Sequence, residues 1–325
     1  MDLTLARLSE IPNLTVSRDA RLSAYTRFAI GGPADIYAET ESVESFIQAL
    51  AVARTSGRDY MVMGGGTNLV VSDLGFRGIM LRFVARRILA AGDRVQCDAG
   101  AVLQDLVDFS IGHGLQGIET LAGIPGSVGA AVYGNAGAYG HSISERVRAV
   151  RFFDGERVRM FDNAECEFHY RESVFKRHKD WIVFSTELHL TPANAPALRK
   201  TADDILKVRN EKFPITMKCA GSIFKNFLWT ELPPAVAAAI PPTVIREGKV
   251  PAAYFLEQAG AKGMSRGDIH VAGYHANLIY NSGGGSAADL RALIEDLKAR
   301  VRRQFAVELE EEVQYVGFTD ARPVG

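Results

Sequence analysis

Cysteine is scarce in this chain of 325 residues, which has only three. Cys97, Cys166 and Cys219 are far apart, odd in number and without the C-x-x-C spacing typical of zinc and redox sites. The seven histidines show no metal-ligand spacing either. The sequence therefore predicts no disulfide framework and no metal site, and it favours a reducing compartment.

An excess of one charge and a long apolar run are also lacking. The 37 Lys and Arg residues and 38 Asp and Glu residues give a formal net charge of −1. Nucleic acids and anionic membranes need a basic face, so neither is an expected partner. No stretch reaches the ~18–20 consecutive apolar residues of a membrane span. The N-terminal stretch carries acids and has no apolar signal core. We expect a cytoplasmic protein without membrane insertion, whose protein partners the sequence leaves open.

The chain has the length of two domains and an ordinary globular composition, with 47% hydrophobic and 23% charged residues. Strand-like and helix-like apolar patterns are mixed along it, which predicts an α+β fold. Prolines 192 and 196 mark a linker, so we expect a domain boundary between residues 192 and 215, and a second breaker region spans residues 233–242. The patterns predict a hairpin turning at 154–155 and helices over 43–57, 197–212 and 287–305. A further helix should stop at 112–114, and another, beginning at residue 252, should be capped by Gly260 or Gly263.

Glycine is the residue in excess, with 31 positions, some of which gather in three clusters. Gly64–Gly66 follows an expected strand, and such a run can point several backbone N–H groups at one anion. A tight turn between strands explains this cluster equally well. Gly123, Gly126 and Gly129 precede small residues, which favours a helix start with free N–H groups close to an anion, or else close packing. Gly283–Gly285 precedes Ser286 and indicates a flexible loop followed by a helix N-cap.

The standard nucleotide-binding motifs are missing. The pattern GxxxxGK[ST] does not occur, which excludes a P-loop NTPase. The spacing at 123–129 is GxxGxxG and not the GxGxxG of a Rossmann fold. If a dinucleotide binds this chain, it does so in another fold.

Seven segments in order along the chain share one further pattern. They read YTRFAIGGPADIY (25–37), MVMGGGTNLVVSD (61–73), IETLAGIPGSVGAAVYGNAGAYG (118–140), HYRESVFK (169–176), RNEKFP (209–214), AGSIFKN (220–226) and EEVQYVG (311–317). Together they resemble the UDP-N-acetylenolpyruvoylglucosamine reductase (MurB) family of peptidoglycan synthesis. Any one motif would be weak, but seven in sequence are specific. Only 41 positions separate Arg171 from Lys212, so the chain resembles the branch of this family without an extra tyrosine-bearing loop.

The resemblance implies a vanillyl-alcohol-oxidase-type FAD-binding domain over residues 1–195, made of two subdomains split near residues 80–90. An α+β substrate domain would follow over 205–325, and its last strand could return to the FAD half. In this family NADPH reduces FAD, and a hydride then reaches the enolpyruvyl group of UDP-N-acetylglucosamine enolpyruvate, giving UDP-N-acetylmuramate. The alternatives are another FAD-dependent alcohol or sugar oxidoreductase of the same fold, and a non-catalytic flavin- or nucleotide-sugar-binding regulator.

The expected reaction needs a cation, an acid and a proton donor. Hydride addition builds negative charge on the substrate carboxylate, and the α carbon is then protonated. By resemblance, Arg171 and Glu312 stabilise that charge and Ser222 is the donor. A guanidinium has the right shape for a carboxylate. Taken alone, Arg171 is typical of a surface ion pair, Ser222 of a turn, and Glu312 of a solvated edge strand in the acidic run 308–312.

The resemblance also implies the binding residues. Lys212 would contact the substrate diphosphate, and Asn226 and His275 would bind substrate, although a lone histidine is more often structural. Phe227 stands where the family usually has proline, which could reshape the loop that carries Ser222. The FAD contacts would come from the first two glycine-rich segments, namely Met63, Gly64, Gly65, Gly66, Thr67, Asn68, Leu69, Ile124, Pro125, Gly126, Ser127, Gly129, Ala130, Asn135 and Gly137.

Overall fold

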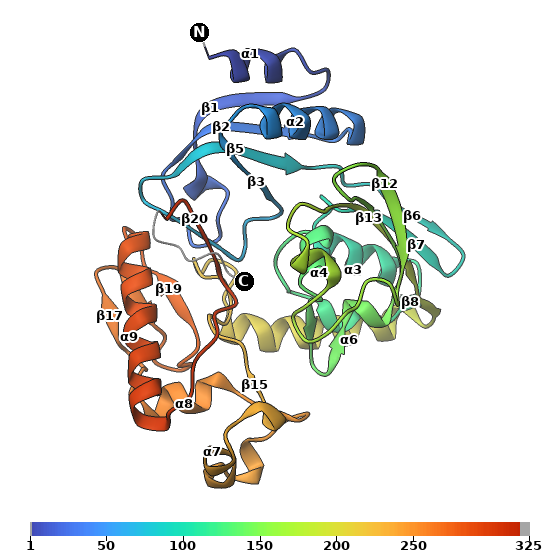
Figure 1. Ribbon diagram of the computed structural model, residues 1–325. Coiled ribbons are helices and arrows are strands. Elements are labelled where there is room, and N and C mark those ends of the chain that lie inside the picture. The colour runs from blue at the N-terminus through green and yellow to red at the C-terminus, as the bar shows by residue number, and fades with distance from the viewer. Residues whose placement is uncertain (1, 319–325) are drawn as a thin grey trace. The chain divides into compact units, whose positions relative to one another are not determined.

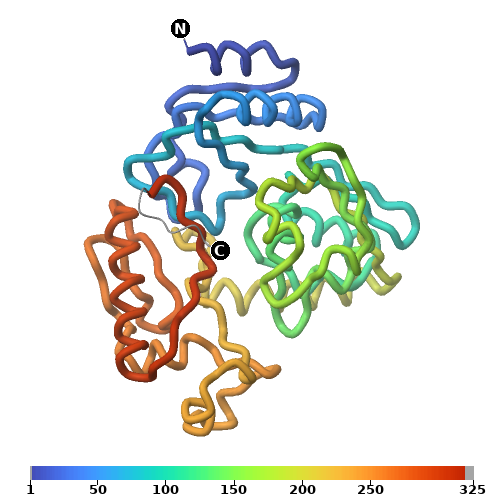
Figure 2. The backbone as a smooth tube through the Cα atoms, in the orientation of Figure 1, coloured from blue at the N-terminus to red at the C-terminus, as the bar shows by residue number. Residues whose placement is uncertain are grey.

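The computed structural model describes residues 2–318, and the α+β class is confirmed (Figure 1). The described chain forms two compact units. Unit 1 contains residues 2–20, 34–65 and 77–211, and unit 2 contains residues 21–33, 66–76 and 212–318. The path in Figure 2 therefore passes between the units several times. These units are not the ranges 1–195 and 205–325, which stay a prediction for the domains.

The first layer of unit 1 is a four-stranded sheet in the order β1-β2-β5-β3, in which β3 and β5 run parallel. Helix α2 packs its buried Phe46 into the same core as Ile79 of β5. Ser42 begins this helix by accepting a hydrogen bond from the Ser45 N–H (3.2 Å), and Gly57 follows its end at φ +71°. The elements of this layer are α1 (Leu3–Ser9), β1 (Thr15–Arg21), β2 (Pro33–Thr40), α2 (Val43–Thr55), β3 (Asp59–Met63) and β5 (Phe76–Phe83).

The second layer of unit 1 is a five-stranded antiparallel sheet in the order β12-β11-β13-β7-β6. The predicted hairpin is confirmed, because the Asp154 carboxylate accepts hydrogen bonds from two turn N–H groups (3.0 and 2.9 Å) and Gly155 has φ +101°. Helices α3 and α4 share a core with this sheet. The elements are β6 (Ile88–Ala91), β7 (Arg94–Asp98), α3 (Leu103–Gly112), β8 (Leu115–Gln116), α4 (Val128–Tyr133), β9 (Gly137–Ala138), β10 (His141–Ser142), β11 (Val147–Phe153), β12 (Val158–Asp162), α5 (Val174–Arg177), β13 (Ile182–His189), β14 (Thr191–Pro192) and α6 (Ala195–Lys212).

Unit 2 has a three-stranded antiparallel sheet, β17-β18-β19, which shares one core with α8 and α9. Phe28 and Val70, from the first quarter of the chain, are buried in that core. Strand β20 pairs in parallel with β4, with Gln314 opposite Leu69. The elements are β4 (Leu69–Val71), β15 (Phe227–Leu228), α7 (Pro234–Ala239), β16 (Lys249–Val250), α8 (Ala252–Gln258), β17 (Ser265–Arg266), β18 (Ile269–Val271), β19 (Ile279–Asn281), α9 (Ala287–Phe305) and β20 (Gln314–Val316).

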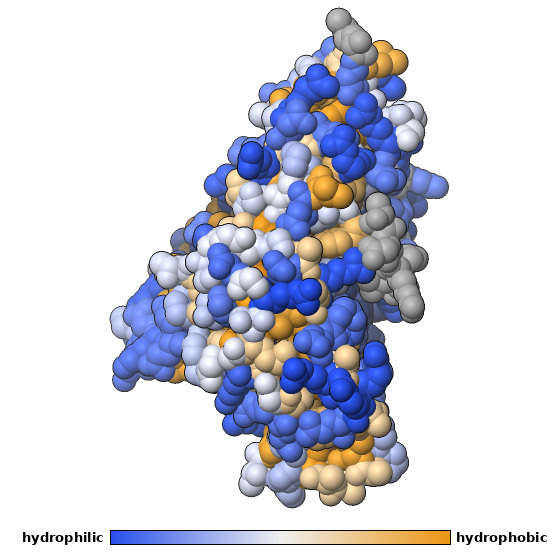
Figure 3. All heavy atoms as spheres, turned by 90° about the vertical axis from the view of Figure 1, so that its left-hand side faces the viewer, coloured by the Kyte–Doolittle hydropathy of each residue, from blue (hydrophilic) through white to orange (hydrophobic). Residues whose placement is uncertain are grey.

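The proline-rich segments fold differently from the expectation. Pro196 lies in the first turn of α6, where a missing N–H breaks no helical hydrogen bond, and not in a linker. The breaker region contains α7, which begins at Pro234 for the same reason. No charged residue occurs from Leu232 to Ile245. Hydrophobic side chains gather at the bottom of Figure 3, where Figure 1 places α7.

The third glycine cluster is fixed in place, which differs from the flexible loop that was expected. The N–H groups of Gly283 and Gly285 donate to Oδ1 of Asn281 (2.9 and 3.0 Å), and that of Gly284 donates to Asp268 (2.8 Å). The expected N-cap is confirmed, because the Ser286 hydroxyl accepts a hydrogen bond from the Asp289 N–H (3.0 Å). Within residues 2–318, no helix combines the length and the apolar character that crossing a bilayer requires.

Candidate active site

The first two glycine clusters touch each other in unit 1. A Cβ atom at Gly65 would lie 3.1 Å from both the Cα of Gly126 and the backbone N of Ser127. A Cβ atom at Gly64 would lie 3.0 Å from the Ser127 hydroxyl. Few real Cβ atoms have contacts this tight, so any larger residue on the β3 side would require the backbone of Gly126 and Ser127 to shift. The two segments expected to hold one diphosphate therefore meet, which a simple turn between strands would not require.

The helix start in the second cluster was expected to offer free N–H groups, and this expectation is wrong. The N–H groups of Val128 and Gly129 donate to backbone carbonyls of the 99–101 segment (2.8 Å each). The N–H of Ala130 donates to the hydroxyl of Ser127, the N-cap of α4 (3.3 Å). An anion here would contact the backbone of the turn that precedes α4. The positive end of the α4 helix dipole would add a favourable charge interaction.

The side chains in that turn are small enough for a diphosphate to reach the backbone. Gly64, Gly65 and Gly126 present no side chain, and Gly126 has φ +120°. Ile124 and Pro125 precede Gly126, and the Cβ of Ala130 would lie 3.4 Å from a Cβ added at Gly64. On this evidence of shape, the residues of unit 1 fit the diphosphate of a dinucleotide cofactor.

Other residues predicted to contact the cofactor have structural partners. The Asn135 side-chain amide donates to the carbonyl of His169 (2.8 Å) and accepts from the Ser144 N–H (3.3 Å). Gly129 and Gly137 lie where the backbone is close to other parts of unit 1. A Cβ added at Gly129 would lie 2.8 Å from the Ala99 Cβ, and one added at Gly137 would lie 2.5 Å from a backbone carbonyl of β10. These contacts explain the residue types without a ligand.

The remaining predicted cofactor residues continue the chain after Gly65. Met63 is the buried last residue of β3, Gly66 has φ +64°, and Leu69 is the buried first residue of β4. Thr67 lies between these strands. In unit 2 the side-chain amide of Asn68 donates to the backbone carbonyl of Glu312 (2.5 Å). The backbone carbonyl of Asn68 accepts a hydrogen bond from the N–H of Gln314 in β20 (2.9 Å).

Arg171 lies in a tight two-residue turn of unit 1. The flanking residues His169 and Glu172 exchange both backbone hydrogen bonds (3.1 and 3.2 Å). Arg171 itself has φ +57°, a left-handed conformation that costs a non-glycine residue about 1–2 kcal/mol. Its guanidinium donates to the Gly137 carbonyl (3.1 Å) and lies over the ring of Tyr170 (5.6 Å). Strain of this kind is often kept at functional positions.

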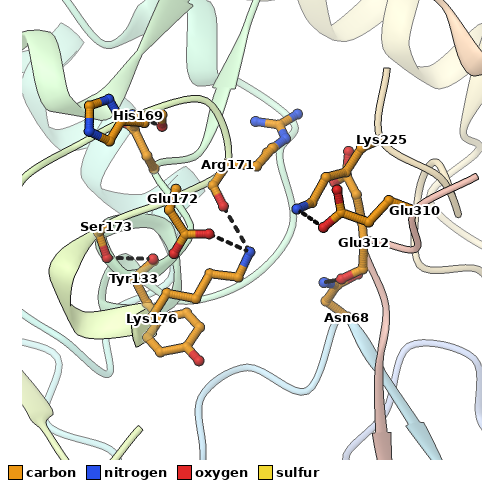
Figure 4. Close-up of polar contacts among 11 residues, drawn as sticks. Asn68, Tyr133, His169, Arg171, Glu172, Ser173, Lys176, Lys225, Glu310 and Glu312 are labelled. Atoms are coloured by element: carbon orange, nitrogen blue, oxygen red, sulfur yellow. Dashed lines mark hydrogen bonds and ion pairs between the residues drawn. The ribbon is translucent and has the colours of Figure 1, made fainter. Parts of the chain in front are cut away.

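Two side chains that the sequence did not single out support the Arg171 turn. Lys176 donates to the Arg171 carbonyl (2.8 Å) and forms an ion pair with Glu172 (3.6 Å), as Figure 4 shows. The buried Ser173 hydroxyl donates to the carbonyl of Tyr133, the last residue of α4 (2.7 Å; Figure 4). Both lie within the HYRESVFK segment, so their presence in the motif was the one available signal. The turn is thereby tied to the helix that follows the second glycine cluster.

Ser222 and Glu312 are brought onto neighbouring backbone segments in unit 2. Ser222 forms a β-bridge with Leu278, and the N–H of Glu312 donates to the carbonyl of Ile223 (2.7 Å). Gly221 precedes Ser222 with φ +80°. Both predicted catalytic residues are half-buried. The residues proposed as proton donor and acid thus come from two backbone segments that are joined by hydrogen bonds.

The acidic run that leads to Glu312 is solvated, as the plain reading of residues 308–312 expects, but it is not an edge strand. The Glu308 and Glu310 side chains are 62% and 70% exposed, and residues 307–310 form no strand. Glu308 pairs with Arg302, Glu310 with Lys225, and Glu311 with Lys298 at 2.8 Å. Figure 4 shows Glu310 turned toward Lys225. These pairs neutralise the acids that flank Glu312 along the chain.

The predicted substrate residues occupy two places in unit 2. Lys212 ends α6, and its carbonyl accepts a hydrogen bond from the Tyr274 hydroxyl (2.9 Å). Burial, and next the positive charge of Lys212, lower the pKa of His275 below its ordinary value. The Asn226 amide oxygen accepts from the first N–H of α8 (3.2 Å), so this side chain caps a helix. The three residues therefore do not form one hydrogen-bonded group.

Phe227 fits its surroundings without the usual proline. It pairs with Val250 across the β15–β16 ladder, and its ring packs edge-on against Phe255 (5.1 Å). Between Arg171 and Lys212 the chain consists of α5, β13, β14 and α6 with short connections, which leaves no long loop in this stretch.

Comparisons with known proteins give the family. A family model described as "FAD binding domain" matches residues 34–159, and one described as "UDP-N-acetylenolpyruvoylglucosamine reductase, C-terminal domain" matches residues 213–316. The expected order of an FAD-binding domain and a substrate domain is thus confirmed.

Relatives match over nearly their whole length. A UDP-N-acetylenolpyruvoylglucosamine reductase of Solibacter usitatus is 67% identical over 96% of this chain and 100% of that protein. The one of Carboxydothermus hydrogenoformans is 35% identical over 91% and 92%. The crystal structure of MurB from Thermus caldophilus superposes with a TM-score of 0.74 at 27% identity, covering 93% of this chain and 99% of that one. The chain therefore belongs to the UDP-N-acetylenolpyruvoylglucosamine reductase (MurB) family.

Proposed function

We propose that this protein is an FAD-dependent oxidoreductase that uses NADPH to reduce UDP-N-acetylglucosamine enolpyruvate to UDP-N-acetylmuramate, a precursor of peptidoglycan. The observation that supports this most is the 67% identity to a reductase of that name over nearly the whole chain. The chemistry that FAD supplies when bound is hydride transfer from NADPH to the β carbon of the enolpyruvyl group.

The chain's own contribution is to stabilise charge and deliver a proton. The Arg171 guanidinium, aimed by its strained turn, is proposed to bind the substrate carboxylate on which charge develops. The Ser222 hydroxyl is proposed to protonate the α carbon. Glu312 is proposed to assist charge stabilisation beside Ser222, its backbone being fixed by hydrogen bonds to Ile223 and Asn68.

Lys212 and His275 are proposed to bind the substrate. The ammonium group of Lys212 suits a diphosphate, and the lowered pKa of His275 favours a neutral ring that can donate or accept a hydrogen bond. Asn226 remains a proposed substrate contact through its side-chain NH₂ group, because the helix cap uses its oxygen.

The activity is tested with the purified flavoprotein. Addition of UDP-N-acetylglucosamine enolpyruvate should accelerate NADPH consumption and yield UDP-N-acetylmuramate in equal amount. NADPH consumption that ignores this substrate, or oxygen reduction driven by an alcohol or sugar, would contradict the proposal.

The glycine contact predicts how FAD binding can be weakened. In Gly65→Val the new side chain would press on the backbone of Gly126 and Ser127. Overpacking of this kind costs about 1–3 kcal/mol, and if that cost falls on the FAD-bound state it would weaken FAD binding about 5- to 150-fold. The matched control is Gly112→Val, since nothing lies within 4 Å of a Cβ at Gly112. Titration of the apoprotein with FAD, followed by fluorescence quenching, measures both affinities. Equal FAD affinity in the two variants would show that the diphosphate lies elsewhere.

We also propose the cytoplasm as the compartment. Cys97, Cys166 and Cys219 are free, buried thiols, as a reducing environment allows, and burial raises the pKa of the Cys97 thiol to about 12. Fractionation of cells that recovered the protein with exported proteins would contradict this.

A further inference from the structure

A buried amide outside the predicted site holds the backbone beside Ser222. Asn277 lies between β18 and β19 and is 2% exposed. Its Oδ1 accepts a hydrogen bond from the Phe224 N–H (2.9 Å), and its Nδ2 donates to the Phe224 carbonyl (2.8 Å). One side chain thus satisfies both backbone groups of a residue two positions beyond Ser222.

The neighbouring backbone contacts extend this link to Ser222 itself. The Ile223 N–H donates to the Asn277 carbonyl (3.1 Å), and Ser222 forms a β-bridge with Leu278. On its other side, the Ile223 carbonyl accepts the N–H of Glu312 (2.7 Å). The Ser222 segment is therefore fastened on one side by residues 277–278 and on the other by the segment that carries Glu312.

The chemistry of the position selects an amide. Both backbone groups of Phe224 are in a residue that is 1% exposed, so water cannot replace a lost partner at low cost. An amide has a donor and an acceptor side by side, a carboxylate offers acceptors alone, and an alkyl group offers neither. Asn277 has the only one of these three chemistries that satisfies Phe224 on both sides.

We propose that Asn277 is a positioning residue for proton delivery by Ser222. This inference rests on the proposed role of Ser222 as donor. In that step the Ser222 O–H bond breaks, the electron pair of the substrate enolate forms the new Cα–H bond, and water reprotonates the serine oxygen. Asn277 touches neither the substrate nor the reacting atoms in this scheme. It fixes the backbone segment that carries Ser222.

The test separates the two half-reactions by stopped-flow spectroscopy of the holoenzyme. Asn277→Ala should slow flavin reoxidation by UDP-N-acetylglucosamine enolpyruvate about 10- to 100-fold, as expected when a reacting group is misplaced. Its solvent deuterium isotope effect on reoxidation should rise, because proton delivery becomes slower relative to the other steps. Flavin reduction by NADPH should keep the wild-type rate. Asn277→Asp has the same shape and keeps an acceptor for the Phe224 N–H, so it repeats the test if the alanine variant does not fold.

Asn281→Ala is the matched control. Asn281 is also buried, at 3%, but its side chain bonds to the Phe28 carbonyl (3.0 Å) and to the third glycine cluster. It should lose stability without a change in the isotope effect. An equal slowing of reoxidation in Asn281→Ala, or an equal slowing of both half-reactions in Asn277→Ala, would overturn the inference.

A double-mutant cycle with Ser222→Ala distinguishes this inference from the proposed function. If Asn277 acts through Ser222, Asn277→Ala should add no further slowing once the hydroxyl is gone. If the slowing factors of the two substitutions multiply in the double variant, Asn277 does not act through Ser222. That result would overturn the positioning role of Asn277 but not the donor role of Ser222. Wild-type reoxidation in Ser222→Ala would overturn the donor role of Ser222, and the inference with it.

Discussion

Replacement of Ser222 by alanine is expected to slow flavin reoxidation by UDP-N-acetylglucosamine enolpyruvate about 10²- to 10⁴-fold, the usual contribution of a positioned proton donor. The fold should persist, because Ser222 pairs with Leu278 through its backbone and alanine keeps that bridge. Reduction by NADPH requires no proton from this hydroxyl, so its rate should not change. Stopped-flow measurement of the two half-reactions checks both statements.

Ser286→Ala is the control for removing a serine hydroxyl from the same unit. Ser286 caps α9 through a hydrogen bond from the Asp289 N–H (3.0 Å), so its loss should cost about 1 kcal/mol of stability. Neither half-reaction should change, since this cap is not part of the proposed chemistry. If Ser222→Ala reoxidised at the wild-type rate, another group or water would be the proton source.

The elements predicted correctly from the sequence are those whose signals are local. The turn at Asp154 and the start of α9 at Ser286 each depend on hydrogen bonds within a few residues of the chain. The partition into units depends on contacts far apart in sequence. A Cβ at Gly75 would lie 1.9 Å from the Pro33 carbonyl, and β20 pairs with β4. The apolar periodicity of a segment does not indicate which distant segment it will pack against or pair with.

The candidate site divides in the same way. Resemblance predicted catalytic roles for Arg171, Ser222 and Glu312, but it assigned no role to Asn277 or to Lys176, although Lys176 lies within one of the motifs. Their function is to bond to backbone carbonyls and N–H groups, and in sequence such residues look like any other polar side chain. The prediction of free N–H groups at the start of α4 was wrong for a related reason. Glycine spacing predicts where a helix can begin, but the 99–101 segment that takes up its N–H groups comes from elsewhere in the chain.

Arg171→Gly should abolish most of the activity while leaving the fold almost unchanged in stability. Glycine would relieve the left-handed backbone at φ +57°, a gain of about 1–2 kcal/mol. Against this, glycine adds about 0.5–1 kcal/mol of unfolded-state entropy, and the hydrogen bond to the Gly137 carbonyl, worth about 1 kcal/mol, is lost. Because these contributions oppose each other, the net change should stay within about 1 kcal/mol in urea denaturation.

The kinetic loss in Arg171→Gly should then report chemistry and not unfolding. Removing one donor from a developing charge usually costs about 10²- to 10³-fold, so reoxidation by substrate should fall by that factor. Arg171→Lys should recover only part of the rate, because an ammonium keeps the charge without the planar fork. The control is Arg177→Ala, which removes an exposed arginine that pairs with Glu167 and should react normally. A normal rate in Arg171→Gly would mean that the strained turn serves packing alone, and the carboxylate of the substrate would need another cation.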